Sequence, residues 1–106
     1  EAGFDNVEVV AGDVLSAEGV FDIVHYDMTI GSDHVCHAHS LLRPGGYLAC
    51  YTPFIEHLCI VMDTAEGLFS SVKAVECIER EMTRSKRGTR PSTRVGHSGY
   101  LTIARK

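Results

Sequence analysis

Two carboxylates, Asp13 and Asp27, stand at positions where this chain could do chemistry, because each follows a short apolar run that predicts a strand. In open α/β sheets, ligands bind at the carboxyl ends of the strands. Thr52 and Pro53 lie at a third such end. Carboxylates at neighbouring strand ends would form a polar site that orients a ligand. The alternative is that each Asp caps a turn or the next helix, as Asp does routinely.

The charge of the chain is unevenly distributed. Residues 1–42 contain eight acidic residues and no Lys or Arg, within a formal net charge of −4 for the whole chain. Residues 80–94 contain six basic residues and one acidic residue, a net +5. A basic segment on an acidic body favours an anionic partner, with phosphate the first candidate. The alternative is a solvated loop that only keeps the protein in solution.

Three histidines, His34, His37 and His39, lie close together with Cys36 among them. On a helix, His34 and His37 share a face and His39 points elsewhere. A metal site needs three or four convergent ligands. We therefore predict an ordinary helix surface and no metal.

The four cysteines include no C-x-x-C pair, which favours a reducing compartment. Cys50, Cys59 and Cys77 lie in apolar segments, so we expect small core residues, with a disulfide as the alternative. Two tyrosines at strand ends, Tyr26 and Tyr51, either pack in the core or stack on a base.

The elements that must position these residues alternate between strands and helices. The predicted strands are residues 6–10, 20–26, 47–51, 71–82 and 99–104, and the predicted helices are residues 33–42 and 54–70. Asp33 can cap the first helix, and the Pro and Gly residues at 44–46 end it. Such alternation predicts a three-layer α/β sheet. The last two strands have an Arg-rich loop and no helix between them, which predicts an antiparallel terminal hairpin.

The length of 106 residues allows one domain at most, residues 1–106. Hydrophobic residues make up 44% and charged residues 23% of the chain, an ordinary globular composition. We expect no transmembrane helix, because no apolar run reaches about 18 residues. The N-terminal sequence EAGFDNVEVV is not a signal peptide. It also begins without Met, which suggests a fragment.

Three segments in order resemble the C-terminal half of a class I S-adenosylmethionine-dependent methyltransferase. They are VAGDV (residues 10–14), FDIVHYD (residues 21–27) and LLRPGGYL (residues 41–48). The resemblance implies a Rossmann-like sheet whose first two strands, with the glycine-rich motif, lie upstream of Glu1. We therefore expect this chain alone to be inactive.

The tail narrows the resemblance. Residues 90–91 (RP), 94–101 (RVGHSGYL) and 104–106 (ARK) are similar to the end of the tRNA (adenine-N1)-methyltransferases of the TrmI type. The implied function is S-adenosylmethionine-dependent methyl transfer to N1 of an adenine in the tRNA T-loop. The resemblance further implies a cytoplasmic homo-tetramer that binds tRNA.

The resemblance also assigns roles to residues. Asp13, with Gly12 and Val14, would contact the methyl donor, and Asp27 would face both donor and target base as the catalytic residue. The target would be extruded into the site. The implied RNA-binding residues are Arg84, Lys86, Arg87, Arg90, Arg94 and His97, although His97 could instead form a structural hydrogen bond.

Two other functions stay open at the level of sequence. One is a related methyltransferase with a small-molecule substrate, of the precorrin type, which would not need a basic loop. The other is a non-catalytic RNA-binding subunit that keeps the fold without binding the donor.

Overall fold

The computed structural model describes residues 3–106, except for the side chains of Arg94, Val95, His97 and Ser98. Its elements are a 3-10 turn η1 (Val14–Ser16), β1 (Phe21–Asp27), α1 (Ser32–Leu41), β2 (Leu42–Thr52), α2 (Ile55–Glu66), β3 (Ser71–Ser85) and β4 (Gly88–Arg105). The α/β class predicted from the sequence is confirmed. No helix among the described residues is long and apolar enough to cross a membrane.

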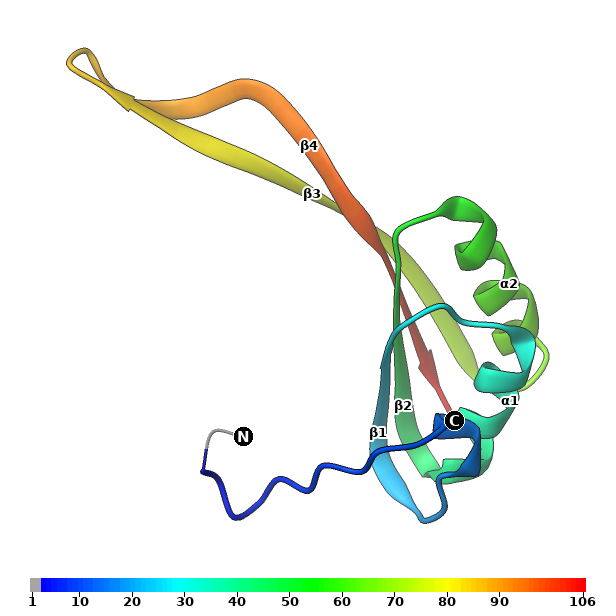
Figure 1. Ribbon diagram of the computed structural model, residues 1–106. Helices are drawn as coiled ribbons and strands as arrows, with labels where there is room; N and C mark the ends of the chain where they lie inside the picture. Colours follow the sequence, from blue (N-terminus) through cyan, green and yellow to red (C-terminus); the bar gives the residue numbers. More distant parts are fainter. Residues whose placement is uncertain (1–2) are drawn as a thin grey trace.

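The four strands form one mixed sheet in the order β1-β2-β4-β3. β1 and β2 are parallel, whereas β4 pairs antiparallel with both β2 and β3. Helices α1 and α2 lie on the same side of the sheet (Figure 1). The described residues therefore form two layers instead of the predicted three, because both helices pack on one face and no described helix covers the other.

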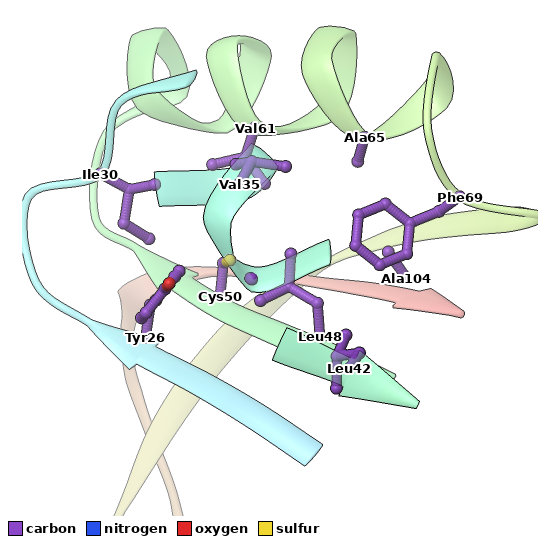
Figure 2. Packing of buried hydrophobic residues seen from close by; sticks show 11 residues of the cluster. Tyr26, Ile30, Val35, Leu42, Leu48, Cys50, Val61, Ala65, Phe69 and Ala104 are labelled. Carbon is purple, nitrogen blue, oxygen red and sulfur yellow. The ribbon is translucent and has the colours of Figure 1, made fainter. Parts of the chain in front are cut away.

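The core fills the space between this sheet face and the two helices (Figure 2). The sheet contributes alternate residues of β2 and β4, as a strand with one covered face requires. The helices contribute residues spaced three or four apart, as one helix face requires. The cluster consists of Tyr26, Ile30, Val35, Ala38, Leu42, Leu48, Cys50, Val61, Ala65, Phe69 and Ala104.

The geometry of the connection from α1 into β2 explains why glycines stand at positions 45 and 46. Gly45 has φ 81°, a left-handed value that glycine adopts at little cost. A Cβ at Gly46 would lie 2.9 Å from the carbonyl oxygens of Arg43 and Asp22, so the backbones approach closely there. The C-terminus is joined to the same turn, since Gly45 N–H donates to the carbonyl of Lys106 at 2.8 Å.

The predicted cap of α1 is wrong. The N-cap residue is Gly31, and His34 Nδ1 accepts from its N–H at 3.0 Å. Asp33 lies inside the first turn, where its carboxylate accepts from the N–H of His34 at 2.9 Å. The helix begins one residue earlier than predicted because the imidazole of His34 satisfies the Gly31 N–H that the helix leaves unpaired.

The strand predicted for residues 6–10 is wrong. This segment belongs to no strand, and the side chains of Val7, Val9 and Val10 are 61%, 71% and 78% exposed. Figure 1 shows the segment running away from the sheet. A strand exists only through backbone pairing with a neighbour, and no described strand lies beside these residues.

The predicted Arg-rich loop is also wrong, because β3 and β4 continue through it as a two-stranded hairpin. Thr83 pairs with Arg90 and Ser85 with Gly88, so only Lys86 and Arg87 are left to form the turn. This hairpin arm, residues 78–97, projects beyond the body of the molecule (Figure 1). The longest dimension of the whole molecule, arm included, is 55 Å.

Candidate active site

Asp27 is the last residue of β1 and lies in register with Tyr51 of β2. It lines a cavity of about 190 Å³ formed where β1 and β2 end and α2 begins. The lining residues are Asp27, Met28, Thr29, Tyr51, Pro53, Phe54 and His57. We call this the Asp27 cavity. It lies at the carboxyl edge of the parallel pair, where the sequence places a site.

Local sequence explains how α2 contributes to the Asp27 cavity. Pro53 cannot donate to a strand ladder, which suits the end of β2 at Thr52. Phe54 is the N-cap of α2, and His57 lies in the first turn. The rings of Phe54 and His57 meet edge to face, with centroids 6.1 Å apart and an interplanar angle of 86°. The two rings therefore hold each other at the cavity wall.

The two tyrosines predicted as core or base-stacking residues behave differently. Tyr26 is a core residue, 3% exposed, and its hydroxyl donates to the carbonyl of His34 at 3.1 Å. Burial, followed by the influence of Cys50 and then Asp33, raises the pKa of Tyr26 above its ordinary value. Tyr51 is half-buried and lines the Asp27 cavity, so of the two only Tyr51 can contact a ligand there.

Asp13 lies elsewhere. Its carboxylate accepts from the N–H of Leu15 at 2.9 Å and so caps η1. It lines a separate cavity of about 670 Å³ whose walls come from residues 8–21. The structure therefore does not bring Asp13 and Asp27 together, because residues 6–10 form no strand that could hold Asp13 at the same sheet edge.

The two cavities lie at opposite ends of β1 among the described residues. Phe21, at the start of β1, lines the Asp13 cavity, whereas Asp27, at its end, lines the other. A strand rises about 3.3 Å per residue, so these ends are about 20 Å apart.

The basic residues lie on the hairpin arm. The side chains of Arg84, Lys86, Arg87 and Arg90 are exposed near its tip, whereas those of Arg94 and His97 lie outside the described part of the structure. Thr52, at the end of β2, pairs with Tyr100 of β4. The arm thus leaves the sheet at the same edge that carries the Asp27 cavity.

The histidines near α1 have separate structural partners. His34 accepts from the N–H of Gly31, His37 Nε2 lies 3.0 Å from the carbonyl oxygen of Ala17, and His39 packs edge-on against Phe69. No group of three or more potential metal ligands exists among the described residues.

The cysteines predicted to be core residues differ in burial. Cys50 is fully buried, as predicted, and burial raises the pKa of its thiol to about 12. Cys77 is half-buried. The prediction for Cys59 is wrong, because the thiol is exposed on α2. The buried face of α2 contains Leu58 and Val61 instead.

Sequence reasoning missed Phe54 and His57. The available signal was the spacing Pro53-x-x-x-His57, in which a strand-ending proline precedes a helix by two residues. That spacing puts residue 57 in the first helical turn, next to the strand end.

The fold is similar to that of solved methyltransferase structures. Both the sheet and the two helices are shared with them. An S-adenosylmethionine-dependent O-methyltransferase from Thermotoga maritima covers 90% of this chain with a TM-score of 0.76 and 20% identity. This chain covers 37% of that structure.

The particular resemblance is to TrmI. The chain is 37% identical over 113 residues to the tRNA (adenine(57)-N(1)/adenine(58)-N(1))-methyltransferase TrmI of Methanocaldococcus jannaschii. That alignment includes 99% of this chain and 39% of the relative, so the chain spans about two fifths of the relative's length. The TrmI structure from Aquifex aeolicus covers 89% of this chain, with a TM-score of 0.74 and 21% identity, and this chain covers 40% of it. No protein-family model matches the chain. The resemblance stated from the sequence is confirmed.

Proposed function

We propose that the whole protein is a tRNA (adenine-N1)-methyltransferase that uses S-adenosylmethionine. The observation that carries the proposal is the 37% identity to TrmI, which extends over 99% of the chain and so includes the Asp27 cavity and the arm. Cytoplasmic location and a homo-tetramer are part of the same proposal, by resemblance to that family.

The position of the arm supports a large anionic substrate. Residues 90 and 100 of β4 are ten residues apart, which corresponds to about 30 Å of strand. A substrate whose reacting group lies in the Asp27 cavity must therefore reach roughly that far to contact the basic tip. A folded RNA does so, and its phosphates would contact Arg84, Lys86, Arg87 and Arg90. The proposed contacts include Arg94 and His97 by resemblance.

Asp27 supplies the chemistry that this chain can contribute. Adenine N1 already carries a lone pair, so the protein has to place the base in line and steady the positive charge that the ring acquires. Asp27 does both if its carboxylate accepts a hydrogen bond from the exocyclic amine. Tyr51 and Phe54 line the Asp27 cavity and would pack against the base. S-adenosylmethionine supplies the methyl group.

The residues that the resemblance assigns to the donor are Gly12, Asp13 and Val14, with Asp27. We include Asp13 in the proposal as a contact to the adenine of the donor in the whole protein. Its capping bond to Leu15 is the competing role, and the two are separable by substitution.

The small-molecule alternative has less support. A small acceptor in the Asp27 cavity would leave a basic arm of about 30 Å without a function. The non-catalytic RNA-binding alternative also has less support. It gives no role to the Asp27 carboxylate, which forms no ion pair among the described residues.

Transfer of labelled methyl groups from S-adenosylmethionine to bulk tRNA by the whole gene product tests the proposal. We expect label at adenine N1 in the wild type and a loss of at least about a hundredfold in kcat for Asp27→Ala, with donor affinity measured in parallel. Asp63→Ala, which removes an exposed carboxylate of α2, is the control. Donor binding without tRNA methylation would favour the small-molecule enzyme, and tRNA binding without donor binding would favour the RNA-binding subunit.

A further inference from the structure

His57 stands out among the polar groups of the Asp27 cavity that the proposed reaction does not use. It is half-buried and lines the same cavity as Asp27. Its ring packs edge-on against Phe54. Within the described part of the chain its imidazole nitrogens form no hydrogen bond. Thr29 and Tyr51 also bring hydroxyl groups to the lining, and the remaining residues are apolar or aromatic. His57 is the cavity residue besides Asp27 whose polar group is not a hydroxyl, and a neutral imidazole nitrogen can accept a hydrogen bond from the edge of a ligand.

We propose that His57 is a specificity-determining residue that accepts a hydrogen bond from the exocyclic amine of the target base. This inference rests on the proposed function. The amine of adenine carries two hydrogens, and N1 must stay free to attack the methyl group. Asp27 accepts one hydrogen, and a neutral imidazole nitrogen of His57 accepts the other. Two acceptors around one amine select adenine, because a base with a carbonyl at that position would face two acceptors with no donor.

Phe54 has a positioning role in the same arrangement. Its side chain is 62% exposed, so one face of the ring is open to a ligand. The edge-to-face contact with His57 fixes the imidazole, and the free face of the Phe54 ring is available for an extruded base. Loss of the ring would release His57 from its orientation.

The test compares His57→Leu with His57→Gln in the whole gene product. Leu fills the space without polar atoms, whereas the Gln amide oxygen still accepts a hydrogen bond. We expect His57→Leu to lower kcat/KM for tRNA at least about tenfold, the loss for one hydrogen bond to a buried polar group. His57→Gln should restore the rate to within about threefold. Donor affinity, measured by calorimetry, should be unchanged in both variants.

The control is Asp63→Leu, which removes a polar group from the exposed face of the same helix. A His57→Leu enzyme as active as the wild type would overturn the inference, and so would equal losses in His57→Leu and His57→Gln. Both results require an active wild type, so they are distinct from failure of the proposed function, in which the wild type itself does not methylate tRNA.

Discussion

Gly99 of β4 lies directly against the phenol ring of Tyr51 on β2. A Cβ at residue 99 would lie 2.5 Å from the Cε2 and Cζ atoms of that ring. The backbone of β4 therefore sets the position of a ring that lines the Asp27 cavity. The Tyr51 ring can occupy its position at the cavity because residue 99 has no side chain.

The first prediction concerns this contact. Gly99→Ala should push the Tyr51 ring toward the Asp27 cavity, because real Cβ contacts do not occur at 2.5 Å. We expect KM for tRNA to rise several-fold and the protein to lose about 1–3 kcal/mol of stability, as overpacked sites do. The double variant Gly99→Ala, Tyr51→Phe keeps the clash with the ring carbons, whereas Gly99→Ala, Tyr51→Leu removes it. Recovery of stability in the second only would verify the contact, and no loss in Gly99→Ala itself would contradict it.

The second prediction separates the two roles of Asp13. Asp13→Ser retains a side chain that can cap η1, whereas Asp13→Ala does not. We expect Asp13→Ser to keep wild-type stability, and Asp13→Ala to lose about 1 kcal/mol. If Asp13 also contacts the donor in the whole protein, both variants should weaken S-adenosylmethionine binding about tenfold in calorimetry. Unchanged donor affinity in both would leave Asp13 with the capping role alone.

The third prediction concerns the hairpin arm. Replacing Arg84, Lys86 and Arg87 with Gln should weaken tRNA binding and reduce the slope of log affinity against log salt by about one for each lost phosphate contact. Lys73→Gln is the matched control, because Lys73 is an exposed cation of the same strand within the body of the sheet. An unchanged salt slope in the triple variant would exclude the arm from phosphate binding.

The fourth prediction follows from Cys50. Burial raises the pKa of its thiol from 9.0 to about 12 in the folded protein. The thiol stays protonated in the folded state at pH values where it ionises in the unfolded state, so its contribution to stability is complete below pH 9.0 and is lost as the pH rises toward about 12.

The measurement is the urea midpoint between pH 8 and 11 for the wild type and Cys50→Ala. We expect a smaller fall of the midpoint with pH in the variant. Some dependence should remain, because burial also raises the pKa of Tyr26. At pH 8, iodoacetamide should modify the exposed Cys59 and spare Cys50. Identical pH dependence in the two proteins would contradict the assignment.

The sequence by itself determined the elements whose signals are local. Residues 21–27 and 47–51 form strands, and the helices lie within a few residues of their predicted bounds, because apolar periodicity and Pro or Gly punctuation are properties of adjacent residues. It also placed Asp27 at a strand end and carried the resemblance to TrmI in the tail.

Only the tertiary structure decided which segments pair and which side chains meet. Residues 6–10 have the composition of a strand but no partner, whereas residues 83–90 read as a loop but pair with each other. Asp13 and Asp27 looked equivalent in sequence and line different cavities, while His57 joins Asp27 from 30 residues away. These outcomes depend on backbone pairing and packing between distant segments, which no local pattern specifies.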